Sequence, residues 1–214
     1  MIISRGRSYV FVHIPKTGGT SLAQALEERA MRDDILIGDT PKAQRRKGRL
    51  KKLEARGRLW KHATLADIDG VLSSTQLTEM FVFTMVRNPW DRLVSYYHWL
   101  RVQQFEHPAV ICAKSLDFSR FIEADQVQKS LRNSPARSYM TDCSGVVHCA
   151  AAIRLEHFEE DAKPLFEHLG FSIRLPHLNA SARAADYRGY YTPATRGIVA
   201  SVCREDIEAF GYAF

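Results

Sequence analysis

The segment from His13 to Ser21 (HIPKTGGTS) joins a short apolar run to an amphipathic one and carries a lysine between them. Backbone N–H groups at the start of a helix lack partners within the helix, and the helix dipole favours negative charge there. Gly18 and Gly19 let the main chain approach an anion closely, while Lys16 adds positive charge. Three hydroxyls can donate further hydrogen bonds: Thr17, Thr20 and Ser21. The segment therefore predicts a cradle for a terminal phosphate-type group.

The order of residues in this loop differs from that of a Walker A loop. Lys16 precedes both glycines, whereas GxxxxGK[ST] places its lysine after the last one. A second apolar run, Phe81 to Val86, ends in Arg87, where a nucleotide kinase or hydrolase would commonly carry an aspartate for Mg²⁺. The cation favours direct binding of a second phosphate, without a metal, and Ser95 lies two helical turns further on, near enough to join it.

These residues need strands and helices to position them. Tyr9 to Ile14 and Phe81 to Val86 have the length and composition of buried strands. The pattern predicts helices from about Thr20 and from Asn88-Pro89. Further expected elements are a short helix opened by a capping box at Thr64–Asp67, a strand at Ile153–Leu155, a helix over Phe158–Leu169 that Pro164 kinks and Gly170 ends, and a last helix from Thr192-Pro193 to about Phe210. Strands alternating with helices predict an α/β fold with a parallel sheet.

Composition predicts one domain that binds anions. The chain has 214 residues and a formal charge of +6, and we expect a single domain over residues 1–214. Residues 42–61 hold ten basic residues against one acid, Glu54, and form an expected exposed insertion that is partly helical. No segment approaches the ~20 apolar residues of a membrane span or reads as a signal peptide. Integral membrane contact is not expected, and the expected compartment is the cytoplasm.

The motifs resemble those of the carbohydrate-type (family 2) sulfotransferases. HIPKTGGTSL is similar to the 5′-phosphosulfate loop of that family, and VRNPWDRLVSYY to its 3′-phosphate motif. The similarity continues through KHATLADI, IRLEHFEEDAKPLFEHLGF, LPHLN and YYTPATRGIVASVCREDIEAFGY. It implies a P-loop-like three-layer α/β/α fold with a short central parallel sheet, and transfer of a sulfuryl group from 3′-phosphoadenosine 5′-phosphosulfate to an acceptor hydroxyl. The donor-binding residues it implies are Lys16, Thr17, Gly18, Gly19, Thr20, Ser21, Arg87 and Ser95, with Arg188 and Tyr191 enclosing the nucleotide.

Sulfuryl transfer needs a cation for the leaving group and a base for the acceptor. Lys16, at the head of the loop, is placed to neutralise the charge that develops on the nucleotide phosphate. Among the eight histidines, His62 in KHAT resembles the catalytic base of family members that modify uronic acids. His13 belongs to the loop and is expected to orient it. The remaining histidines lack HxH or HExxH spacing, so no metal is expected.

Each of these assignments has a plainer alternative. The two glycines also suit an ordinary turn, Arg87 a surface ion pair, Ser95 a neutral helix position, and His62 a core or helix-flanking site. Arg188 and Tyr191 equally suit a surface ion pair and a core aromatic. Two competing functions stay open: a P-loop-like kinase, and a non-catalytic polyanion-binding module that uses residues 42–61. The expected acceptor is a carbohydrate or a small metabolite, not a nucleic acid.

Overall fold

The computed structural model describes residues 1–176, 184 and 186–214. They divide into two compact units. The first contains the described residues of Met1–Val86 and Ala136–Leu178, and the second those of Arg87–Pro135 and Asn179–Phe214. Part of the LPHLN stretch, residues 177–179, lies outside the described residues.

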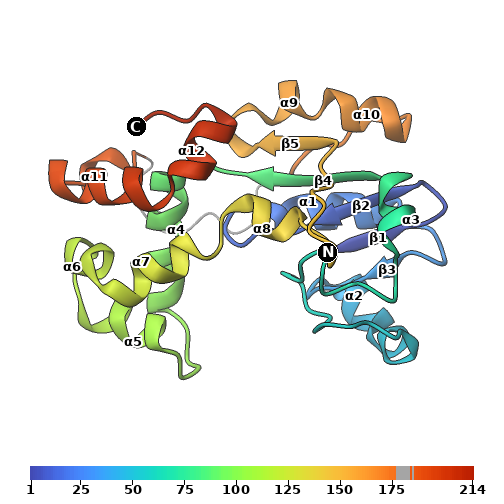
Figure 1. The fold of residues 1–214 in the computed structure, drawn as a ribbon, viewed down its shortest axis with the longest axis horizontal. Helices are drawn as coiled ribbons and strands as arrows, with labels where there is room; N and C mark the ends of the chain where they lie inside the picture. Colours follow the sequence, from blue (N-terminus) through green and yellow to red (C-terminus); the bar gives the residue numbers. More distant parts are fainter. Residues whose placement is uncertain (177–183, 185) are drawn as a thin grey trace. The chain divides into compact units, whose positions relative to one another are not determined.

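The first unit is built on a mixed sheet of five strands in the order β3-β1-β2-β4-β5. β2 pairs in parallel with β4, and β4 with β5, whereas β1 is antiparallel to both β2 and β3 (Figure 1). The expected α/β class and central parallel strands are confirmed, with two antiparallel strands added at one side. The strands are β1 (Ile2–Ser4), β2 (Tyr9–Val12), β3 (Ile35–Leu36), β4 (Phe81–Val86) and β5 (Ala151–Arg154).

Alternate residues of the strands fill two separate apolar layers. Val10 belongs to one buried cluster and Phe11 to the other, as the period of two along a strand requires. Leu22 and Leu26 of α1 (Gly19–Glu28) pack into the Phe11 layer with α9 (Phe158–Asp161) and α10 (Lys163–Leu169). The Val10 layer is closed by the turns of residues 63–72, by α3 (Ser74–Thr78) and by α8 (Ala136–Met140). The sheet is thus covered on both faces.

Two expected helices are interrupted. The stretch that begins at Phe158 breaks at Ala162, one residue before α10, and Gly170 ends it in the left-handed conformation. The expected kink near Pro164 and the stop at Gly170 are confirmed. The last helix is divided at Cys203 into α11 (Pro193–Val202) and α12 (Arg204–Phe210), and the Thr192 side chain caps α11.

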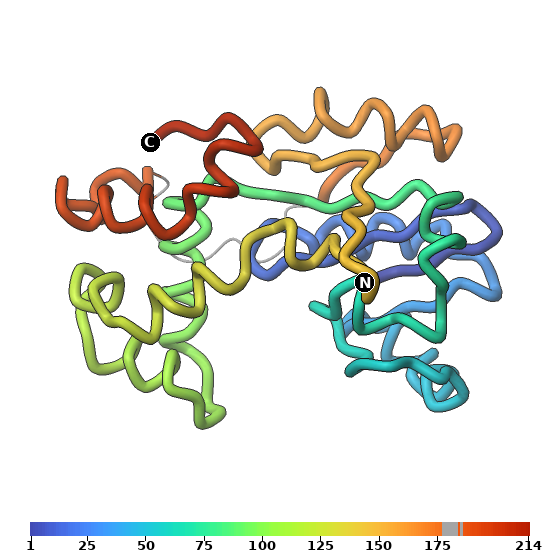
Figure 2. The backbone as a smooth tube through the Cα atoms, viewed as in Figure 1, coloured from blue at the N-terminus to red at the C-terminus, as the bar shows by residue number. Residues whose placement is uncertain are grey.

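The helix expected after Thr64 does not form, and that prediction is wrong. The capping-box hydrogen bonds are present, since the Thr64 N–H donates to Asp67 Oδ2 at 2.7 Å and the Asp67 N–H to Thr64 Oγ1 at 3.2 Å. Instead of continuing as a helix, residues 65–71 run through successive turns (Figure 2). The Leu65 N–H donates to the Tyr139 carbonyl, and Gly70 adopts a φ of 90°. Tertiary hydrogen bonding therefore overrides the local signal.

Among the described residues of the second unit, all of the regular secondary structure is helical. The side chains of Leu93, Val94 and Tyr97 on α4 (Pro89–Arg101) form one buried cluster with Phe121 of α6 (Phe118–Glu123) and Val199 of α11. Asn88 caps α4 by accepting a hydrogen bond from the Trp90 N–H, as its Asn-Pro start predicts. The other helical segments among the described residues of this unit are α5 (Pro108–Ser115), α7 (Asp125–Arg132), α12 and the 3₁₀ turn η3 (Arg188–Tyr190).

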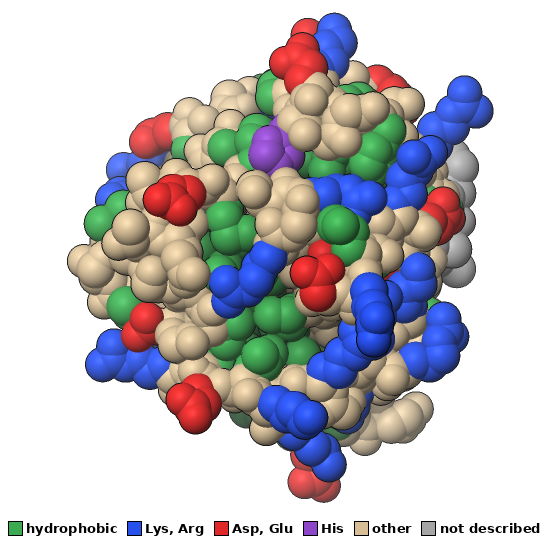
Figure 3. Space-filling view, turned by 90° about the vertical axis from the view of Figure 1, so that its right-hand side faces the viewer, with side chains coloured by type: hydrophobic (Ala, Val, Ile, Leu, Met, Phe, Trp, Pro, Cys, Tyr) green, Lys and Arg blue, Asp and Glu red, His purple; other side chains and the backbone are tan. Residues whose placement is uncertain are grey.

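The basic segment 42–61 is partly helical. It contributes α2 (Pro41–Arg46) and the 3₁₀ helix η1 (Lys47–Lys52), and most of its Lys and Arg residues are exposed. The face of the molecule in Figure 3 shows Lys and Arg side chains outnumbering Asp and Glu. Ala43 is buried in the segment, and Leu50, Leu53 and Leu59 pack against the Val10 layer. The segment is therefore anchored to the first unit by its apolar residues.

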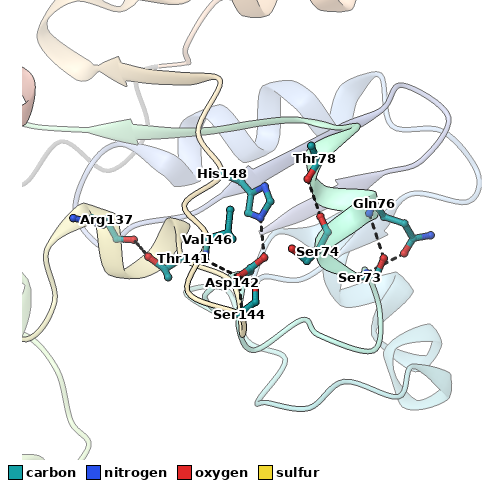
Figure 4. Close-up of polar contacts among 10 residues, drawn as sticks. All are labelled: Ser73, Ser74, Gln76, Thr78, Arg137, Thr141, Asp142, Ser144, Val146 and His148. Carbon is teal, nitrogen blue, oxygen red and sulfur yellow. Dashed lines mark hydrogen bonds and ion pairs between the residues drawn. The ribbon is translucent and has the colours of Figure 1, made fainter.

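A buried carboxylate closes the turn that leads into β5. Asp142 Oδ1 accepts hydrogen bonds from the N–H of Ser144 and the N–H of Val146, and Oδ2 contacts His148 Nε2 at 2.8 Å (Figure 4). Interaction with the Ser74 hydroxyl is the largest cause that holds the pKa of Asp142 far below its usual range. The side chain is 2% exposed, so these bonds replace its hydration almost completely.

We expect Asp142→Asn to lower the free energy of unfolding by roughly 2–3 kcal/mol at pH 7, because the amide cannot accept all of these hydrogen bonds. A depressed pKa stabilises the fold above the ordinary value near 4, and this contribution is lost as pH falls through the folded-state pKa. The difference between the two proteins in urea unfolding should therefore shrink from pH 7 to pH 3. Asp33→Asn, at an exposed position, is the control and should change little. Equal stabilities of Asp142→Asn and the unchanged chain at pH 7 would contradict this account.

Candidate functional site

The loop between β2 and α1 is shaped by two glycines. Gly18 is the N-cap of α1 and adopts a φ of 83°, in the left-handed region that favours glycine. A Cβ on Gly19 would lie 2.2 Å from the His13 ring, so the buried imidazole packs directly on the main chain. No side chain caps α1, and its first turn contains no acidic residue. The helix therefore begins with an uncompensated positive dipole end, which suits an anion.

Two more residues of the loop define its shape. The Thr17 hydroxyl is buried and donates to the Ile14 carbonyl at 2.9 Å, so it holds the turn closed. Lys16 adopts a φ of 66°, a left-handed conformation that costs a residue with a Cβ roughly 1–2 kcal/mol. Ser21 is buried in the first turn of α1, and Thr20 is half-buried beside it. The structure thus brings together at one helix start all the loop residues that the sequence predicted.

His62 lies against this loop. Its Nδ1 is 2.8 Å from the His13 carbonyl oxygen, and the two imidazole rings are 4.7 Å apart. Because a carbonyl only accepts, Nδ1 must carry the proton, and the lone pair of the neutral ring is on Nε2. Burial lowers the pKa of His62 to about 4, and burial also lowers the pKa of His13 well below its ordinary value. His62 is therefore neutral at pH 7, with Nε2 in the form of a proton acceptor.

The second predicted motif begins at the residue after β4 and lies in the second unit. The Arg87 guanidinium donates to Asp91 Oδ2 from Nε at 2.9 Å and from a terminal nitrogen at 2.6 Å. Ser95 follows Asp91 by one more helical turn and is buried on the same face of α4. Within the described part of the chain, the Ser95 hydroxyl has no hydrogen-bond partner. Asp91 was not singled out from the sequence, although its spacing of four residues from Arg87 is a visible signal for an ion pair.

Arg188 and Tyr191 lie near each other at η3, but their side chains differ in setting. Arg188 is exposed, 3.4 Å from the Asp186 carboxylate and stacked over the Tyr187 ring. Tyr191 is half-buried, and its hydroxyl donates to the Trp90 carbonyl at 2.8 Å. Tyr191 thus holds η3 against the start of α4, which is the helix that follows Arg87.

Each of the two motifs starts at the carboxyl end of a strand of the sheet. β2 and β4 are adjacent parallel strands, so their carboxyl ends lie at the same edge of the sheet. The loop that contains Lys16 leaves one of these ends, and the chain passes to Arg87 from the other. In open α/β sheets, ligands bind outside the carboxyl ends of the strands. Arg154, which was assigned no role from the sequence, ends β5, and its guanidinium donates two hydrogen bonds to the Asp161 carboxylate, of 2.7 and 3.0 Å.

Comparison with known proteins decides the family. The profile of the sulfotransferase family matches residues 1–213. The chain belongs to the sulfotransferase family. The predicted resemblance is thereby confirmed, and the protein is an enzyme of sulfuryl transfer rather than a kinase or a non-catalytic module.

One solved structure adds evidence on the fold of this sulfotransferase. The chain superposes on mouse sulfotransferase SULT7A1, whose structure is a complex with PAP, with a TM-score of 0.50 and 15% sequence identity. The alignment covers 97% of this chain and 87% of the mouse protein. No curated protein matches. At this identity the likeness concerns the fold, and it is the α/β fold expected from the sequence.

Two further findings concern only the described residues. No cluster of three or more His, Cys, Asp or Glu side chains in this part of the sulfotransferase has the arrangement of a metal site. No helix among the same residues is long and apolar enough to cross a membrane.

Proposed function

We propose that this sulfotransferase uses 3′-phosphoadenosine 5′-phosphosulfate as its donor and sulfates a hydroxyl of a carbohydrate. The observation that carries the proposal is the uncapped, acid-free start of α1, which Gly18, Gly19 and Lys16 leave open to an anion. The two motifs follow neighbouring parallel strands, which supports a ligand with two separated phosphate groups. The 5′-phosphosulfate is assigned to residues 16–21, and the 3′-phosphate to Arg87 and Ser95.

The reaction follows from these assignments. The acceptor oxygen attacks sulfur, the new O–S bond forms, and the bond from sulfur to the bridging oxygen breaks. The electron pair of that bond leaves with the nucleotide phosphate, whose developing charge the Lys16 ammonium and the α1 N–H groups stabilise. The hydroxyl proton passes to Nε2 of His62, whose tautomer the His13 carbonyl fixes. The products are the sulfate ester and 3′-phosphoadenosine 5′-phosphate.

Asp91 has a role in this proposal that the sequence did not reveal. Its carboxylate holds the Arg87 guanidinium through two donors on one side. A guanidinium presents its five N–H donors in a fixed planar fork that matches the geometry of a phosphate. The ion pair restrains a long side chain before the nucleotide arrives, and such restraint reduces the entropy lost on binding.

The test is calorimetric titration with 3′-phosphoadenosine 5′-phosphate in the presence of EDTA. We expect the unchanged chain to bind, and Arg87→Ala to weaken the affinity by about tenfold or more, because a charge-assisted hydrogen bond is worth ~1.5–3 kcal/mol. Arg101→Ala is a matched control, since Arg101 is an exposed arginine at the far end of the same helix. Absence of binding by the unchanged chain would refute the proposed donor, and an equal loss in both variants would refute the assignment of Arg87.

A further inference from the structure

Trp60 is an exposed aromatic residue two positions before the proposed base. It is 42% exposed, whereas Trp90 is 4% exposed in the core of the second unit. An exposed indole offers a flat apolar face on which a ligand can pack. Its position beside His62 makes it a candidate for contact with the acceptor.

The geometry joins Trp60 to His62 directly. The indole and the imidazole meet edge to face, with ring centroids 5.1 Å apart and an interplanar angle of 85°. A ligand ring on the exposed part of the indole therefore lies next to the imidazole that receives the hydroxyl proton in the proposed reaction. A pyranose suits this surface, because one of its faces presents C–H groups while its hydroxyls point outward.

The backbone holds this pair in place. The Ala63 N–H donates to the Trp60 carbonyl at 2.9 Å, and His62 Nδ1 contacts the His13 carbonyl at 2.8 Å. Leu65, which follows, is fully buried. The ring of Trp60 is thus carried by a short turn anchored at both the catalytic loop and the core, which fixes its distance from His62.

The charge next to Trp60 selects the kind of sugar. The Arg58 guanidinium lies over the indole, 5.5 Å from the ring centroid, and its side chain is exposed. The two nearest cations in the sequence already form ion pairs: Arg56 pairs with Asp69, and Lys61 pairs with Asp39. Among the described residues, Arg58 forms no ion pair with a carboxylate. It is therefore the cation beside Trp60 that can bind an acidic group of a ligand.

We propose that Trp60 and Arg58 form the acceptor subsite, where the indole packs on a pyranose ring and the guanidinium binds the carboxylate or sulfate of that sugar. This inference rests on the proposed role of His62 as base. The subsite selects anionic sugars over neutral ones, and it places a hydroxyl of the bound ring beside Nε2.

The test follows tryptophan fluorescence during titration with three tetrasaccharides: hyaluronan, which carries carboxylates, chondroitin sulfate, which also carries sulfates, and chitotetraose, which is neutral. We expect at least one anionic tetrasaccharide to quench the fluorescence and chitotetraose to bind about tenfold more weakly. By calorimetry, Trp60→Ala should weaken binding of the anionic ligand about tenfold, and Trp60→Phe less, because the aromatic contact is retained in part. Arg58→Gln should remove the preference for the anionic ligand. Trp99→Phe is the fluorescence control.

Activity and donor binding separate this inference from the function it rests on. Trp60→Ala should raise the KM for the anionic acceptor by a larger factor than it lowers kcat, because most of the contact with the sugar ring is made in the ground state as well as in the transition state. Its affinity for 3′-phosphoadenosine 5′-phosphate should be unchanged. If the unchanged chain binds that nucleotide but none of the tetrasaccharides, or if Trp60→Ala binds them normally, the subsite is refuted and the donor assignment stands. Failure to bind the nucleotide refutes the donor assignment instead, and the saccharide titrations then still decide the subsite.

Discussion

Lys16→Ala should lower kcat by about 10²–10³-fold, the magnitude typical of removing one preorganised stabiliser of developing charge. The ammonium is the proposed partner of the departing phosphate, and the charge on that group is greatest in the transition state. KM should change less than kcat, because this interaction strengthens as the bond to sulfur breaks. Steady-state kinetics with the donor and a hydroxyl acceptor give both constants.

The left-handed backbone of Lys16 provides a second, independent measurement. Alanine at this position retains the unfavourable φ of 66°, whereas glycine adopts it at little cost. Lys16→Gly should therefore be more stable to urea than Lys16→Ala, by roughly 1 kcal/mol, while losing as much activity. Higher stability with lower activity is the signature of backbone strain kept to place a functional side chain.

Two results would contradict this assignment. Lys16→Ala with near-normal kcat would show that the ammonium does not meet the leaving group. Equal stabilities of the alanine and glycine variants would show that the loop relaxes when the lysine is removed. Lys114→Ala, on the exposed surface of α5, controls for the loss of one positive charge from the whole protein.

The sequence predicted the loop of residues 13–21 and the start of α4 because their signals are local. Gly18 and Gly19 fix the loop through backbone conformation and close contact, and Asn88-Pro89 starts the helix through capping. These effects act within a few residues, so no tertiary information is needed to find them. The strand Phe81–Val86 was likewise found at its observed bounds, since its apolar composition matches burial on both faces.

The sequence did not predict the features that depend on distant partners. β1 and β3 are only three and two residues long, and they become strands by pairing with β2 and with each other. Thr64–Asp67 carries a good local helix signal, but Leu65 bonds to Tyr139, which lies far along the chain. Periodicity contains no information about such pairs.

The same reasoning explains the candidate site. His62 was found through its motif, but the contact that fixes its tautomer, with the carbonyl of His13, joins residues far apart in the sequence. The proposed role of Trp60 in acceptor binding depends on the exposure of its indole and on the angle between its ring and that of His62. Neither property can be read from composition. The residues of a site were thus predictable, and the contacts that set their protonation and access were not.

His62→Ala should lower kcat by about 10²–10⁴-fold, the contribution typical of a positioned general base. For the unchanged enzyme, the pKa of about 4 predicts that kcat/KM holds level from pH 7 to about pH 5 and falls below it as the imidazole gains a proton. An ordinary histidine would already lose activity near pH 6.5. Because Nδ1 carries the proton of the neutral ring, only Nε2 accepts the hydroxyl proton. Free imidazole added to His62→Ala can take the place of the missing ring as a base, so it should restore part of the activity. Unchanged circular dichroism across this range separates protonation from unfolding.

The acid limb is the decisive part of this profile, since a purely structural histidine would lower activity without changing its pH dependence. The limb should vanish in His62→Ala, whose residual rate no longer depends on protonation of the ring. His157→Ala, at an exposed histidine, should retain the full rate and the full limb. A limb near pH 6.5 that survives in His62→Ala would assign the base to another residue. Without rescue by imidazole, and with the limb intact, His62 would be a packing residue for the His13 loop.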